Sequence, residues 1–146
     1  MLHNTLADNA TNEGTSGEGI HVGAHCTVAF TNTIVSGHPT AGITVREGST
    51  VRLKGTLWYG NGVDTGGEGS IITSQDYVGG PDFIDPAEGN YHIGCLSAAL
   101  DRVVNEGVTE DVDGETRPQG LAPDLGADEA VCGSRHLLHL PLILRP

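Results

Sequence analysis

The sequence predicts an all-β fold in which short strands stack as the successive coils of a solenoid. Three observations predict it: a 23-residue repeat, a glycine-rich and aromatic-poor composition, and alternating apolar and polar side chains. Gly19-Ile20-His21-Val22 returns as Gly42-Ile43-Thr44-Val45, and Thr27-Val28 returns as Thr50-Val51 at the same offset. A repeat of this length, rich in Thr, Val, Ile and Gly, is typical of a chain that winds into stacked coils.

The composition indicates a one-domain protein with many tight turns and an acidic surface. The 146 residues suffice for one domain with a core, and the 22 glycines are expected at tight turns between short strands. Seven basic residues against 19 acidic ones give a net charge of −12. Such a surface repels the phosphates of nucleic acid, so we expect no nucleic-acid partner. It suits an exported protein or one that binds cations.

The first coil is expected over 19–39 and the second over 42–62. Period-2 alternation in the second coil predicts one set of inward side chains, Val51, Leu53 and Leu57, and one outward set, Arg52, Lys54, Thr56 and Trp58. Side chains at equal positions are expected to stack between coils, for example Ile20 on Ile43, Val22 on Val45 and Phe30 on Leu53. Each large inward side chain contributes about 1.5–3 kcal/mol through burial.

A third, degenerate coil is expected to begin near Gly69 with a short strand over 70–73. Turn-forming residues over 76–81 are expected to end the repeat. Apolar residues between 96 and 104 have helical spacing, which predicts one short helix with Ser97 as its N-cap and Gly107 as its stop. We expect this helix to close the end of the solenoid. The chain thus divides into coils over 1–80, a closing segment over 81–130 and a tail over 131–146.

The N-terminal residues already resemble the repeat, since residues 4–9 are similar to residues 32–37. Solenoids need atypical caps at their ends, so we expect the chain to be the C-terminal piece of a longer protein. Its first coil is expected to fray or to self-associate with a second copy. The N-terminus lacks signal-peptide regions, and no apolar run reaches about 18 residues, so we expect no membrane span.

The order of short motifs in the closing segment carries a family resemblance. The motifs are Asp82-Phe83-Ile84-Asp85-Pro86, Gly89-Asn90-Tyr91-His92-Ile93, Leu96-Ser97-Ala98-Ala99-Leu100-Asp101, Asp111-Val112-Asp113-Gly114-Glu115-Thr116-Arg117-Pro118 and Asp124-Leu125-Gly126-Ala127-Asp128-Glu129. With the coil repeat, this order resembles the C-terminal end of right-handed parallel β-helix proteins of the pectate-lyase-like superfamily. The closing motifs are similar to those of bacterial secreted proteins of the choice-of-anchor type, and the tail over 137–146 is similar to Leu/Pro tails of bacterial surface proteins.

The resemblance implies a right-handed parallel β-helix of about three coils with an irregular C-terminal cap, in a secreted or cell-surface protein. It implies a non-catalytic structural or carbohydrate-contacting segment, with no catalytic residue in this chain. The alternative is the C-terminal end of a polysaccharide lyase or glycoside hydrolase whose active site lies on coils outside this chain.

A candidate binding face for acidic polysaccharide lies in the second coil. Arg46, Arg52 and Lys54 fall within nine positions, and all three are expected to face outward. Trp58 shares the outward parity, and Tyr59 is adjacent. An arginine pairs with a uronate carboxylate while an aromatic ring stacks on the sugar face. The alternative is a solvated strand face with Trp58 covered by a neighbouring loop.

A candidate calcium site lies in the closing segment. Asp111, Asp113 and Glu115 surround Gly114, and calcium prefers several carboxylate oxygens around a glycine turn. The spacing falls short of an EF-hand loop. The alternative is a surface turn in which Arg117 pairs with one of these carboxylates, and no other cofactor is expected.

The remaining acidic residues are expected to have structural roles. Asp101 and Asp124 are candidates for buried acceptors of backbone N–H groups. Asp82 and Asp85 are the nearest pair of carboxylates for glycoside hydrolysis, but turn aspartates commonly bind local backbone instead.

The three cysteines suggest different states. Cys26 is expected to be a buried free thiol on a strand, whereas Cys95 and Cys132 flank the acidic part of the closing segment and are candidates for a disulfide if the chain is exported.

Overall fold

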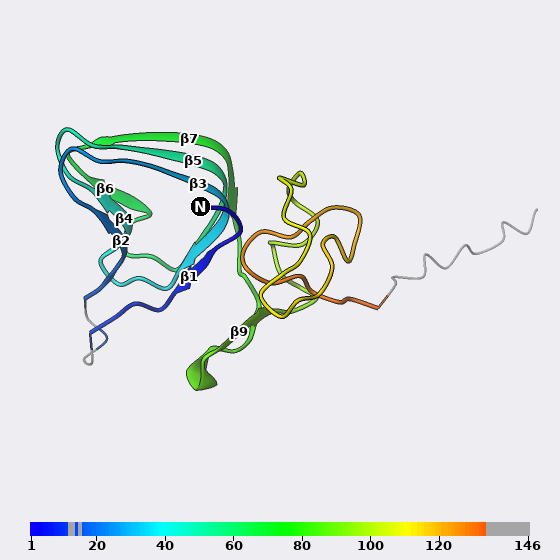
Figure 1. Cartoon of the computed structure of the whole chain (residues 1–146). Helices are drawn as coiled ribbons and strands as arrows, with labels where there is room; N and C mark the ends of the chain where they lie inside the picture. Colours follow the sequence, from blue (N-terminus) through cyan, green and yellow to red (C-terminus); the bar gives the residue numbers. More distant parts are fainter. Residues whose placement is uncertain (12–13, 15, 134–146) are drawn as a thin grey trace, which may run out of the picture.

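The computed structural model describes residues 1–11, 14 and 16–133, and its strands form two parallel sheets and one small antiparallel pair (Figure 1). The elements in chain order are β1 (Thr5–Ala7), β2 (Glu18–Val22), β3 (Thr27–Ser36), β4 (Ala41–Val45), β5 (Thr50–Tyr59), β6 (Thr65–Gly67), β7 (Ser70–Val78), β8 (Phe83–Asp85), the 3-10 helix η1 (Pro86–Glu88) and β9 (Asn90–Ile93). The larger sheet has the order β1-β3-β5-β7, and the smaller one β2-β4-β6. The all-β prediction is confirmed.

From β1 to β7, successive strands alternate between the two parallel sheets, and the pairing of β2 with β4 and of β3 with β5 follows the 23-residue repeat. Ile20 lies opposite Ile43, Val22 opposite Val45 and Phe30 opposite Leu53, as predicted. Within the described residues the strands form two separate open sheets rather than a closed solenoid. β1 and β7 are the outer strands of the larger sheet, and pairing of the first coil with a second copy stays a prediction.

Each strand of the larger sheet bends at one equivalent position. Asn32, Gly55 and Gln75 have φ values of 57°, 69° and 58°. The pairing register places them side by side on β3, β5 and β7. A residue in the left-handed conformation breaks the extended backbone, so the simple alternation of side chains does not continue across it. Leu53 and Trp58 therefore reach the same core although one has an odd number and the other an even one.

Two apolar cores result from this bend. The first lies between the two sheets and consists of Val22, Phe30, Val35, Ile43, Val45, Val51, Leu53 and Trp58. The second joins the larger sheet to the closing segment and consists of Ile34, Leu57, Ile93, Ala99, Val103 and Leu125. Leu57 is fully buried, but it packs against the closing segment and not inside the coils, which corrects its predicted direction.

The outer strands differ from their predicted limits. β6 begins at Thr65, before the predicted start of the third coil, and β7 continues to Val78 through residues expected to form a turn. Because β5 supplies hydrogen-bonding partners along its edge, the neighbouring backbone stays extended despite unfavourable side chains. β1 pairs with β3 so that Leu6 lies opposite Val35. The similarity of residues 4–9 to residues 32–37 would place Leu6 opposite Ile34, one residue earlier.

The closing segment consists of turns, and it lies beside the bent part of β3, β5 and β7 instead of over the end of the coils (Figure 1). The predicted helix after Ser97 is wrong. Ser97 Oγ accepts the Ala99 N–H at 3.1 Å, as an N-cap would, but Asp101 has a φ of 54° and ends the turn. In the described part of the chain, no helix is long and apolar enough to cross a bilayer.

A buried ion pair holds the closing segment together. Arg117 Nη1 donates to Glu129 Oε1 at 2.7 Å, and the two side chains are 1% and 0% exposed. Glu129 also accepts the backbone N–H groups of Asp124 and Gln119 at 2.6 and 3.1 Å. Arg117 Nη2 donates to the carbonyl of Gly126 at 3.0 Å. The expectation that Arg117 pairs with a carboxylate of the surface turn is therefore wrong.

Asp124 is the buried backbone acceptor that was predicted. Its carboxylate accepts the N–H groups of Asp101 and Ala130 at 2.7 and 3.0 Å. Burial is the main cause that raises the pKa of Asp124, to about 6. Asp101 accepts the Ala122 N–H at 2.9 Å, but it is exposed, so the prediction of burial fails for Asp101.

The cysteines are distributed as one disulfide and one free thiol among the described residues. Cys95 and Cys132 are joined, with 5.5 Å between their Cα atoms, which ties the end of β9 to the end of the described chain. Cys26 is free and exposed, because it lies in the turn before β3 and not on the strand, so the predicted burial is wrong. Most of the predicted tail, over 134–146, lies outside the described residues.

Replacing Gly55 by alanine tests the bend in β5. A Cβ at this position would lie 2.9 Å from Asn32 Oδ1 in addition to adopting a positive φ. We expect Gly55→Ala to lower the free energy of unfolding by at least about 1–2 kcal/mol in a urea titration. Gly23→Ala is the control, since a Cβ there meets nothing within 4 Å and φ is not positive. Equal stability of the two variants would contradict the assigned bend.

Candidate functional site

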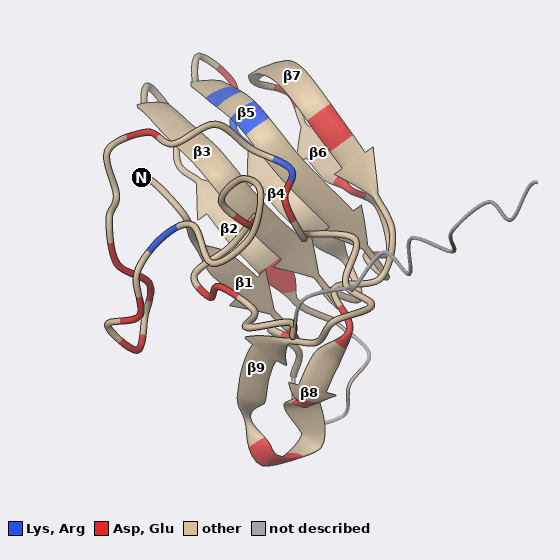
Figure 2. Ribbon diagram, turned by 90° about the vertical axis from the view of Figure 1, so that its right-hand side faces the viewer, with Lys and Arg blue, Asp and Glu red and all other residues tan. Residues whose placement is uncertain are grey.

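The predicted basic face is present in part. Arg46, Arg52 and Lys54 are exposed, and Figure 2 shows the basic bands on β5. Lys54 Nζ lies 2.6 Å from Glu106 Oε1, and Arg46 Nε donates to His21 Nε2 at 3.4 Å. Two of the three cations therefore already have partners on this chain.

The position of Trp58 contradicts the rest of the predicted binding face. Trp58 is 5% exposed and belongs to the core between the sheets, because the bend at Gly55 reverses the parity of the residues that follow. Tyr59 is 51% exposed. The indole ring cannot stack on a sugar, so Arg46, Arg52, Lys54, Trp58 and Tyr59 do not form a common binding face.

The predicted calcium loop is organised around Asp111. Its Oδ1 atom accepts the N–H groups of Asp113 and Glu115 at 2.9 and 2.8 Å, and its Oδ2 atom accepts that of Glu129 at 3.1 Å. Burial alone would raise the pKa of Asp111, but these backbone bonds outweigh it and lower the pKa. Both oxygens thus accept backbone N–H groups. Of the three predicted ligands, only Asp113 joins a group of described side chains whose ligand atoms lie close enough together to hold an ion.

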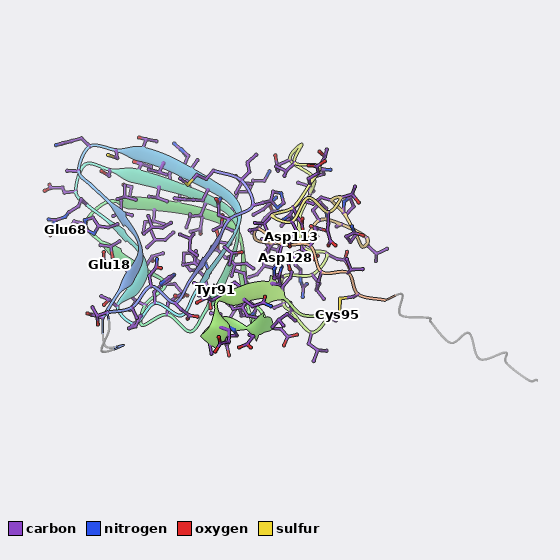
Figure 3. The ribbon with its side chains drawn as sticks, turned by 60° about the horizontal axis from the view of Figure 1, so that its bottom comes forward. Glu18, Glu68, Tyr91, Cys95, Asp113 and Asp128 are labelled. Atoms are coloured by element: carbon purple, nitrogen blue, oxygen red, sulfur yellow. A yellow bond between two sulfur atoms is a disulfide. The ribbon has the colours of Figure 1, made fainter. Side chains whose placement is uncertain are left out.

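Asp113 instead turns toward a histidine on β9. His92 Nδ1 lies 3.2 Å from Asp113 Oδ2 and 3.0 Å from Asp128 Oδ1. Figure 3 shows Asp113 and Asp128 close together in the closing segment. Asp128 is oriented by the Ile93 N–H, which donates to its Oδ2 atom at 2.7 Å. The hydrogen bond to Asp128 is the main cause that raises the pKa of His92, with both aspartate charges adding to it.

His92 and Asp128 also line a cleft of about 400 Å³ that is formed by β1, β9 and the closing segment. Leu6 and Asn9 line one wall, and Tyr91, His92 and Asp128 line the other. The ring of Tyr91 meets Phe83 edge to face, with 5.2 Å between centroids and an interplanar angle of 89°. Burial and the nearby charge of Asp8 raise the pKa of Tyr91, so its hydroxyl remains protonated at neutral pH.

Sequence reasoning did not single out His92 or Asp128 as functional residues. They lie 36 residues apart, on a strand and on an irregular loop, and no spacing rule joins them. The closing-segment motifs contain both residues, but motif order alone does not say which side chains meet. Asp113 is the one predicted metal ligand that reaches this cluster.

Comparisons with protein-family models, curated proteins and solved structures find no match to this chain. The cleft itself offers a ligand an aromatic ring, an amide, an imidazole and one carboxylate, that of Asp128.

Replacing Trp58 separates a core role from a binding role. We expect Trp58→Ala to lower the free energy of unfolding by about 3–5 kcal/mol in chemical denaturation, because a large buried side chain leaves a cavity. Arg52→Ala on the same strand is the control, with an expected change within about 0.5 kcal/mol. A Trp58→Ala variant as stable as Arg52→Ala would place the indole at the surface and reinstate the sequence-based prediction.

Proposed function

We propose that this chain is a non-catalytic segment of an exported right-handed parallel β-helix protein, and that it contacts a neutral glycan in the cleft between β1, β9 and the closing segment. The fold part of the proposal is supported by two parallel sheets whose strands alternate along the chain, with the 23-residue register kept between β2 and β4 and between β3 and β5. Crossover connections between parallel strands are right-handed in nearly all proteins. Further coils of the same repeat would extend both sheets.

Export is supported by the disulfide between Cys95 and Cys132. Structural disulfides form and persist in oxidising compartments and are rare in the cytosol. The high acidic charge suits the same environment, because it keeps an exposed β-sheet protein soluble.

Glycan contact rests on one observation, the cleft with Tyr91 in its lining beside a few polar side chains. Its volume of about 400 Å³ is within the range of small-molecule sites, roughly 300–1,000 Å³. An aromatic ring stacks on the apolar face of a sugar, while Asn9 and Asp128 offer groups for its hydroxyls. The carboxylates of Asp113 and Asp128 repel a uronate, so a neutral glycan replaces the acidic polysaccharide expected from the sequence.

A retention assay on immobilised neutral oligosaccharides tests this proposal, with a panel of cello-, xylo- and manno-oligosaccharides. We expect retention on at least one of them, weakened about threefold to tenfold by Tyr91→Ala through loss of stacking. Tyr59→Ala removes an exposed tyrosine that does not line this cleft, and it should leave retention unchanged. Asn9→Ala is a second cleft variant that spares the contact between Tyr91 and Phe83.

Three outcomes would contradict the proposal: no retention on any neutral glycan, equal effects of Tyr91→Ala and Tyr59→Ala, or retention on acidic glycans alone. If the chain is retained on acidic glycans alone and Arg52→Ala abolishes this retention, the glycan contact lies on the exposed face of β5 instead. The melting temperature of each variant confirms that retention is compared between folded proteins.

A further inference from the structure

We infer that His92, Asp113 and Asp128 form a binding site for a divalent transition metal, with Zn²⁺ as the best-suited ion. The inference does not rest on the proposed glycan contact, although His92 and Asp128 also line the glycan cleft. With the calcium loop that the sequence predicts, the site shares only Asp113.

One nitrogen and two oxygens converge on a small volume. His92 Nδ1 lies 3.0 Å from Asp128 Oδ1 and 3.2 Å from Asp113 Oδ2, and all three atoms lie within 4.8 Å of one another. Zinc binds imidazole nitrogen and carboxylate oxygen at about 2.0–2.2 Å, which sets neighbouring ligands roughly 3.0–3.5 Å apart. Both nitrogen–oxygen separations fit that range, and rotation of the exposed Asp113 side chain adjusts the separation of the oxygens.

The donor set selects the kind of ion. One imidazole with two carboxylates suits Zn²⁺ and its first-row neighbours, whereas Ca²⁺ takes six to eight oxygen ligands. Three protein ligands leave a fourth zinc position for water. The exposure of His92 and Asp113 gives an ion a path from solvent, since their side chains are 43% and 49% exposed.

The surroundings hold two of the three ligands in place. Asp128 is buried, and the Ile93 N–H fixes its Oδ2 atom, so that Oδ1 is directed toward His92. The backbone N–H of Asp113 donates to the Asp111 carboxylate, and this hydrogen bond fixes the loop that carries Asp113. Such outer contacts orient metal ligands and reduce the conformational freedom lost on binding.

The site connects three separate pieces of chain. His92 belongs to β9, Asp113 to the turn between residues 110 and 116, and Asp128 to the loop that ends in the buried ion pair. An ion bound there would cross-link these pieces in the folded state alone, because the unfolded chain does not keep them together. Binding is therefore expected to stabilise the fold.

Zinc titration of the chelator-treated full chain tests the site, with calorimetry for affinity and stoichiometry and with the melting temperature as a second readout. We expect one Zn²⁺ per chain and a raised melting temperature. His92→Gln and Asp113→Asn should each weaken binding by at least about tenfold. The absorption spectrum of the Co²⁺-loaded protein should show a site with one nitrogen and oxygen ligands, and His92→Gln should change it.

His21→Gln is the matched control, because His21 is also exposed and lies 2.8 Å from a carboxylate, that of Glu18. It should leave Zn²⁺ affinity unchanged. Absence of Zn²⁺ binding would overturn the inference, as would equal losses in His21→Gln and His92→Gln. A third outcome would also overturn the inference: the chain binds calcium, Asp113→Asn abolishes this binding, and His92→Gln leaves it intact. That result would favour a calcium site in the loop at Asp111. The glycan assay is run in the presence of chelator, so its outcome does not depend on whether the chain binds Zn²⁺.

Discussion

The buried ion pair between Arg117 and Glu129 is the interaction on which the placement of the closing segment depends. A buried charge is costly unless its partner and its hydrogen bonds are complete. Glu129 meets this condition by accepting two backbone N–H groups besides the guanidinium. Arg117 Nη1 also lies 3.0 Å from Nδ1 of His3, which links the pair to the start of the chain. Burial, with the charge of Arg117 adding to it, lowers the pKa of His3 and keeps its imidazole neutral.

The closing segment in turn completes the sheets. Beyond the bend at Gly55, the larger sheet turns Leu57 and Ile34 outward, and both are fully buried only because the closing segment covers them. The same placement brings Asp113 and Asp128 to His92 on β9 and forms one wall of the cleft. The candidate metal site and the candidate glycan site therefore both depend on a contact that lies outside them.

Sequence reasoning succeeded where local periodicity determines structure and failed where tertiary contacts do. The pairing of Ile20 with Ile43 was predictable because parallel strands of a repeat stack equivalent positions. The direction of the Trp58 side chain was not predictable, because the period-2 pattern does not reveal the left-handed residue at Gly55 that bends the strand. Asp113 was recognised as a candidate ligand by its loop, but its partner His92 lies on a distant strand, and only the fold brings the two together.

Native-state amide hydrogen exchange tests most directly whether the closing segment and the sheets form one cooperative unit. The N–H of Asp124 donates to Glu129, that of Leu125 donates to Ala99, and that of Leu57 lies in the paired strand β5. We expect all three amides to exchange with the free energy of global unfolding and to shift together in Glu129→Gln. Exchange of Asp124 and Leu125 far faster than that of Leu57, with Leu57 unaffected by Glu129→Gln, would contradict the account.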